Sequence, residues 1–154
     1  MSNILYIPRE CVVTHEEKRA WIMLLVSVVA YAVYLTVVLG RAGGGALTAV
    51  SYAGPLLWTV GGAILTSIVV EIAMGVVNPR ASRAKDERDK EIGRLGDHVG
   101  QSFVVIGAVS AMLMALADWD RFWIANVIYL GFVLSAVLGS VTKVIVYRGS
   151  LPQW

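Results

Sequence analysis

The sequence contains little cysteine, histidine and charge. Its 154 residues include one Cys and two His, and 16% are Asp, Glu, Lys or Arg, compared with about a quarter in soluble domains. The single cysteine, Cys11, excludes an internal disulfide framework and a cysteine-based metal motif. A zinc site needs three or four ligands, so we expect no metal and no cofactor. Basic residues are not interleaved with base-stacking aromatics, so we also expect no direct contact with nucleic acid.

Signatures of catalysis are missing as well. We find no nucleophile–base arrangement and no paired catalytic carboxylates in the sequence. The glycines at 43–45 and 61–62 are not followed by Lys-Ser or Lys-Thr, so they do not form a phosphate-binding loop. We therefore expect that the chain is not an enzyme.

Long apolar runs dominate the remaining sequence. Asp, Glu, Lys, Arg and His are absent from residues 21–40, 103–117 and 122–142, and residues 55–77 contain only Glu71. A bilayer core about 30 Å thick is crossed by about 20 apolar helical residues. We predict an all-α integral membrane four-helix bundle, with a single transmembrane domain over residues 1–154 and spans at 20–40, 55–77, 100–117 and 122–146.

Local signals set the predicted helix ends. Thr14 and Glu17 form a capping-box pattern, which predicts a helix starting near His15. Pro55 suits the first turn of the second span, and Asn78 before Pro79 suits its end. The turn at 118–121 is so short that the third and fourth spans should be antiparallel neighbours. The bundle is thus expected to consist of two helical hairpins.

Positive charge predicts the orientation. Eleven of the thirteen Lys and Arg residues lie before the first span, between the second and third spans, or at the end of the fourth, which leaves Arg41 and Arg121 on the other side. Cytoplasmic loops of membrane proteins are enriched in Lys and Arg. We expect a multi-pass protein of the cytoplasmic membrane with both termini inside.

The predicted cytoplasmic connector at 78–99 is the only sizeable hydrophilic segment. Charges four apart support an exposed helix, and Gly93, Gly96 and Gly100 should bend it as it enters the third span. One interpretation is a solvated linker. The other is a binding surface for a protein partner, formed by Asp86, Glu87, Arg88, Asp89 and Lys90.

Glu71 is the most unusual position, because an acid within a span is costly and needs a partner or water. Lys143 has a comparable depth in the fourth span, and His98 and Gln101 enter from the same side. We predict that these four residues converge on a candidate polar site open to the cytoplasm. The alternative is that Glu71 is a paired packing residue and Lys143 reaches the headgroups.

Small residues should mediate helix packing. Gly131, Ser135 and Gly139 recur every fourth residue in the last span, a spacing that lets a partner backbone approach closely. The contact is expected within the bundle or, alternatively, across a homo-oligomer. Asn126 is expected to hydrogen-bond across the turn at 118–121.

The heptapeptide from Asp86 to Ile92, Asp-Glu-Arg-Asp-Lys-Glu-Ile, precedes a membrane span. It resembles the connector of small bacterial membrane proteins of unknown function, the type catalogued as DUF2178. The segments at 17–23 and 122–129 look like the actinobacterial branch of that family. The resemblance implies four helices and association with small helix-turn-helix regulators, and it supplies no activity or site residues.

Three functions stay open at this point. The first is a non-enzymatic sensor or accessory protein that acts through its charged connector. The second is a small proton-linked transporter, or a resistance or immunity protein, that uses Glu71. The third is a structural subunit of a larger membrane complex.

Overall fold

The computed structural model describes residues 15–77 and 87–149. Its long helices are α1 (His15–Ala42), α2 (Ala53–Val77), α4 (Glu87–Leu116) and α5 (Arg121–Arg148), with a short 3₁₀ turn η1 (Leu47–Ala49) between α1 and α2. All four are long and apolar enough to cross a membrane. At 1.5 Å per residue, even the 25 residues of α2 extend about 38 Å, more than the roughly 30 Å of hydrocarbon. Within the described residues, the prediction of an all-helical fold with four helices long and apolar enough to cross a membrane is confirmed.

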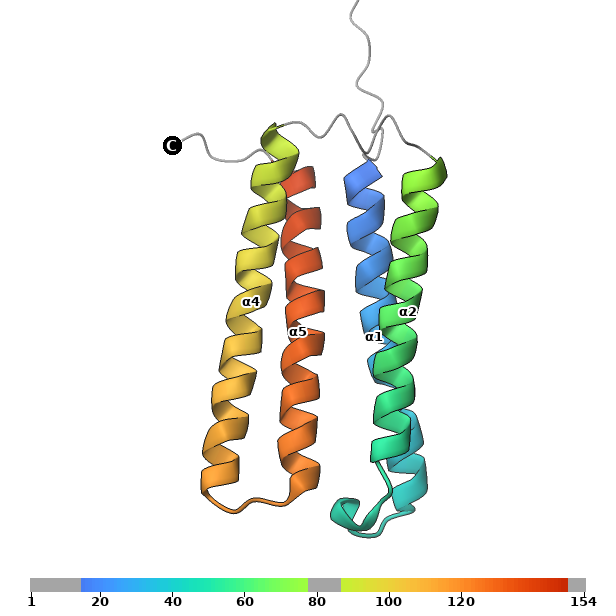
Figure 1. Ribbon diagram of the computed structural model, residues 1–154, viewed down its shortest axis with the longest axis vertical. Coiled ribbons are helices and arrows are strands. Elements are labelled where there is room, and N and C mark those ends of the chain that lie inside the picture. Colours follow the sequence, from blue (N-terminus) through green and yellow to red (C-terminus); the bar gives the residue numbers. More distant parts are fainter. Residues whose placement is uncertain (1–14, 78–86, 150–154) are drawn as a thin grey trace, which may run out of the picture.

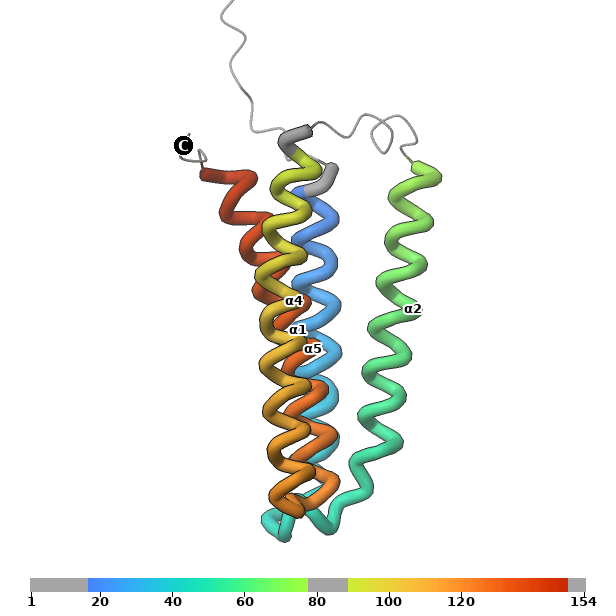
Figure 2. The backbone as a smooth tube through the Cα atoms, turned by 60° about the vertical axis from the view of Figure 1, so that its left-hand side comes forward, coloured from blue at the N-terminus to red at the C-terminus, as the bar shows by residue number. Residues whose placement is uncertain are grey.

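The helices lie side by side with their axes roughly along one direction (Figure 1). Contacts connect them in the order α2, α1, α5, α4, with the most extensive packing between α4 and α5. Figure 2 shows α2 standing apart from the other three helices. Pro55 is the only buried residue of α2, so most of this helix faces outward.

Two ends of the bundle can be distinguished. We call the end at which α1 begins and α5 ends the charged end, and the end that carries η1 and the α4–α5 turn the turn end (Figure 1). At the turn end, the side chain of Asp120 accepts a hydrogen bond from the Phe122 amide over 2.8 Å and caps α5. This cap satisfies one of the backbone N–H groups that the first turn leaves unpaired.

A small buried cluster lies between α1 and α5. It consists of Tyr34, Val38, Phe122 and Tyr129. Large apolar side chains cover the outside of the helices instead, as with Leu57 and Val77 on α2, which are 69% and 82% exposed. In a bilayer such side chains contact lipid tails, so helix association depends on close packing and hydrogen bonds.

The structure differs from the sequence prediction at the start of α4. We expected a surface helix that bends at Gly93, Gly96 and Gly100 as it enters the third span, but α4 is one α-helix of 30 residues. Gly96 and Gly100 are buried against α5. The close approach that these glycines permit offsets their low helix propensity.

One predicted helix signal can be checked inside the described residues. Pro55 lies in the first turn of α2, as expected, and α1 is described from His15 onward. The expected stop signal at Asn78-Pro79 lies outside the described residues, as do Thr14 and Asp86.

Candidate functional site

Glu71 forms an ion pair with Arg19, which joins α2 to α1. The two side chains are 45% and 37% exposed. Glu71 lies six residues before the end of α2 and Arg19 four residues after the start of α1, so both belong to the charged end. The carboxylate within the second span therefore has the cationic partner that its cost in lipid demands.

Lys143 has a different partner. Its Nζ atom lies 2.8 Å from Oδ1 of Asp97, which joins α5 to α4. The aliphatic part of Lys143 lies over Gly96, where an added Cβ atom would come within 2.6 Å of its Cγ and Cε atoms. Gly96 thus leaves room for the lysine stem, and the ammonium group reaches the exposed carboxylate of Asp97.

The four residues of the predicted polar site are not joined by the contacts of the described chain. Glu71 and Lys143 bind different partners on different helices. His98 and Gln101 are exposed on α4, where the His98 carbonyl accepts a hydrogen bond from Ser102. Sequence analysis missed Arg19 and Asp97 because it did not establish which helices are neighbours.

A third ion pair lies at the charged end. Arg148 Nε donates to Glu17 Oε1 over 2.9 Å, although the Glu17 side chain is only 9% exposed. The Arg148 guanidinium also lies 5.5 Å from the centre of the Trp21 ring, within the range of a cation–π contact. This pair connects α1 to α5, so the three ion pairs join all four helices in the order α2, α1, α5, α4.

Part of the predicted connector belongs to this network. The Tyr147 hydroxyl donates to Asp89 Oδ1 over 3.0 Å, near the end of α5 and the start of α4. Glu87 and Arg88 lie in the first turn of α4, and Lys90 is exposed on it. The start of α4 is therefore held to α5 on one side, whereas Glu91, Arg94, Leu95 and His98 are exposed on the other.

The three predicted packing residues of α5 all face glycines of α4. Gly131 lies against Gly107, Ser135 against Gly100 and Gly139 against Gly96. A Cβ atom on Gly100 would lie 2.9 Å from the Ser135 carbonyl oxygen, and one on Gly139 would lie 3.0 Å from that of Gly96. Such distances bring Cα–H groups close to carbonyl oxygens, which adds weak hydrogen bonds to the dispersion contacts.

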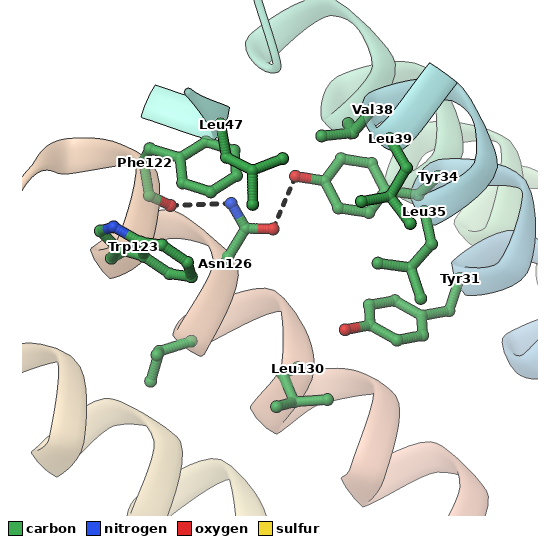
Figure 3. Close-up of a pocket in the computed structure, with 11 residues that line it drawn as sticks. Tyr31, Tyr34, Leu35, Val38, Leu39, Leu47, Phe122, Trp123, Asn126 and Leu130 are labelled. Carbon is green, nitrogen blue, oxygen red and sulfur yellow. Dashed lines mark hydrogen bonds between the residues drawn. The ribbon is translucent and has the colours of Figure 1, made fainter. Parts of the chain in front are cut away.

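A second polar cluster lies nearer the turn end, between α1 and α5. The Tyr34 hydroxyl donates to Asn126 Oδ1 over 2.7 Å, and Asn126 Nδ2 donates to the Phe122 carbonyl over 2.7 Å (Figure 3). The Asn126 prediction was wrong about the partner, which is on α1 and not in the 118–121 turn. Tyr129 also hydrogen-bonds Thr59 of α2 over 3.3 Å.

Sequence analysis did not single out the tyrosines. Tyr31, Tyr34 and Tyr129 form a cluster of aromatic rings whose centres lie 5.0 to 6.3 Å apart. The signal for this cluster was three tyrosines inside apolar spans, because a tyrosine in lipid needs a hydrogen-bond partner for its hydroxyl.

The described residues contain no group of three or more His, Cys, Asp and Glu side chains that could hold a metal ion. Within the described residues, ion pairs connect the helices at the charged end, and hydrogen bonds of Tyr34, Asn126 and Tyr129 connect them nearer the turn end. Comparisons with protein-family models, with curated proteins and with solved structures found no match for this chain.

Proposed function

We propose that the chain is a non-enzymatic sensor or accessory protein of the cytoplasmic membrane that presents the start of α4 to a protein partner. In this proposal the four helices form two hairpins, and the charged end faces the cytoplasm. The excess of Lys and Arg in the segments at that end supports the orientation.

The observation that carries the proposal is the way in which the start of α4 is held. Asp97 binds Lys143 and Asp89 binds Tyr147, so this part of α4 is fixed to the end of α5. Arg148 of α5 is bound in turn to Glu17 of α1. A shift of α1 or α5 within the bilayer would therefore move the surface that α4 presents.

The exposed surface of this segment suits a protein partner. Glu91, Arg94 and His98 offer charge of both signs and hydrogen bonding, and Leu95 is 43% exposed beside them. Protein–protein interfaces commonly have an apolar centre surrounded by a polar rim, and this surface has the same arrangement. It gives specificity through the pairing of opposite charges.

The ion pair of Glu71 argues against the transporter alternative. Arg19 already provides the partner that a carboxylate in lipid requires, so the position of Glu71 is explained without a transported ion. Its helix, α2, lies at the edge of the bundle (Figure 2). We therefore assign Glu71 the role of joining α2 to α1.

Site-specific photocross-linking in cells tests the proposal. A photoreactive amino acid replaces Arg94 in one variant and Trp119, in the α4–α5 turn, in another. We expect a discrete cross-linked protein from position 94 and none from 119. With the photoreactive group moved to Leu95, the charge exchange Glu91→Arg/Arg94→Glu should abolish the product.

The matched control is Glu91→Asp/Arg94→Lys, which keeps both charges and should keep the product. If the exchanged and conservative variants cross-link equally, or position 119 captures the same protein, the proposal is wrong.

A further inference from the structure

A half-open cavity of about 230 Å³ lies between α1 and α5 toward the turn end. Figure 3 shows side chains of both helices around it, with Leu47 of η1 near its outer margin. Its lining is largely apolar and contains no Asp, Glu, Lys, Arg or His. Asn126 and Leu130 lie five and nine residues into α5, which puts the cavity about 8–14 Å from the start of that helix.

The size of the cavity limits what it can hold. Pockets for drug-sized molecules measure roughly 300–1,000 Å³, whereas a cavity of roughly 150 Å³ holds one benzene molecule. A volume of about 230 Å³ lies between these values. The occupant is therefore a small molecule of one or two rings, or the corresponding part of a larger one.

The lining favours aromatic rings. Tyr31, Tyr34, Phe122 and Trp123 all contribute to the cavity. Edge-to-face contacts already occur among them, as between Phe122 and Trp123, whose ring centres lie 5.2 Å apart. A planar ring entering between α1 and α5 would add to these contacts, which aromatic pairs favour.

The Tyr31 side chain carries a polar group that can recognise the occupant. The hydroxyl of Tyr31 points into the space between the helices near Leu130 (Figure 3) and makes no hydrogen bond within the described residues. The neighbouring Tyr34 hydroxyl is already bound to Asn126. A hydroxyl without a partner in an apolar medium is costly, so a ligand with an acceptor oxygen at this point would be favoured over a hydrocarbon.

We infer that the cavity binds an uncharged aromatic ketone or a similarly small lipophilic carbonyl compound from the bilayer, with the carbonyl oxygen accepting a hydrogen bond from Tyr31. The ligand contacts α1 and α5, the two helices that the Glu17–Arg148 pair joins at the other end. The binding site itself does not depend on the partner surface of α4, because different residues form it.

Photolabelling of the full chain in lipid vesicles tests the inference, with benzophenone as the probe because it is itself a small aromatic ketone. After irradiation, mass spectrometry locates the adducts. We expect them in the segments 31–39 and 123–130. Adducts spread over the exposed surfaces of α2 and α4 would overturn the inference, because they would show that the probe only dissolves in the lipid.

Two matched variants examine the cavity. Val127→Phe fills it from a lining position, whereas Ile128→Phe adds the same ring at the next residue of α5, which does not line it. We expect labelling of the two segments to fall several-fold in the first variant alone. Equal labelling of both variants would overturn the inference.

Competition examines the carbonyl without changing the fold. 1-Indanone and indane have the same system of two fused rings, and only indanone carries an acceptor oxygen. At equal concentration in the membrane, indanone should compete about fivefold better, the ratio expected for one hydrogen bond, and Tyr31→Phe should remove the difference. Equal competition in the wild type would refute the role of Tyr31, and competition by neither compound would refute the site.

Discussion

Gly107 of α4 and Gly131 of α5 lie directly against each other. A Cβ atom on Gly107 would come within 3.0 Å of the Gly131 Cα atom, and one on Gly131 within 3.2 Å of the Gly107 Cα atom. Both are tighter than ordinary van der Waals contact, and the neighbouring atom is backbone in each case. The two helices therefore pack at a distance that leaves little room for a Cβ atom at either position, as expected where association depends on close contact and not on the hydrophobic effect.

Replacing either glycine with leucine should separate the two helices. We expect Gly107→Leu and Gly131→Leu each to lower the free energy of unfolding by about 1–3 kcal/mol, the usual cost of overpacking. Titration of the micelle-bound protein with SDS, followed by circular dichroism, measures this loss.

Gly93→Leu is the control for this prediction. Gly93 is also in α4, but nothing lies within 4 Å of a Cβ atom built there. The free energy of unfolding should stay constant or rise by up to about 1 kcal/mol, since leucine favours the helix. If Gly93→Leu lowered the free energy of unfolding as much as Gly107→Leu, the loss would not come from the close packing of α4 against α5, and the prediction would be wrong.

The spans were predictable because bilayer thickness and the cost of charge in lipid act on the sequence directly. Residues 55–77 were predicted for the second span, and α2 is Ala53–Val77. The continuous helix at the start of α4 was not predictable. Glycines such as Gly96 and Gly100 indicate a break in a helix unless it is known that another helix packs against them. Their role depends on Gly139 and Ser135, about forty residues further along the chain.

The candidate site shows the same limit. The cost of a carboxylate in lipid predicted that Glu71 has a partner, and Arg19 is that partner. The depth of a residue in the membrane did not identify this partner, since Lys143 also lies near the charged end. The choice depends on α2 contacting α1 and not α5 at this end, and the order of helices around a bundle has no local signal in the sequence.

The Tyr34–Asn126 hydrogen bond should stabilise the contact between α1 and α5. Tyr34 is fully buried, so Tyr34→Phe removes the donor to Asn126 Oδ1 and admits no water to replace it. We expect a loss of about 1–3 kcal/mol, the cost of an acceptor left unsatisfied, in the same SDS titration.

Tyr31→Phe serves as the control for Tyr34→Phe. It removes a hydroxyl from the same ring cluster, but this hydroxyl makes no hydrogen bond within the described residues. In the absence of ligand, the stability should stay constant or rise, because the hydroxyl that is removed has no partner to lose. Equal losses in the two variants would assign the effect to ring packing and contradict the hydrogen bond.

Arg148→Met should destabilise the charged end, because Glu17 is the more buried partner of this ion pair. A hydrogen bond to a charged group contributes about 1.5–3 kcal/mol, and the exposure of Arg148 favours the lower value. The double variant Glu17→Gln/Arg148→Met should lose less than the sum of the single changes, which thermal unfolding in detergent can measure. Additive losses would mean that the two side chains do not interact.

The proposed orientation can be tested by labelling cysteines from one side of the membrane. Cys11→Ser leaves a chain without cysteine, into which Arg94→Cys and Trp119→Cys are introduced separately. Arg94 is at the start of α4 and Trp119 in the turn that follows α4, so the two positions lie beyond opposite ends of its apolar segment. An impermeant maleimide should label position 119 in intact cells and position 94 only after the membrane is opened.

The reverse pattern would place the charged end outside, against the excess of Lys and Arg there. Labelling of both positions from the same side would mean that α4 does not cross the bilayer.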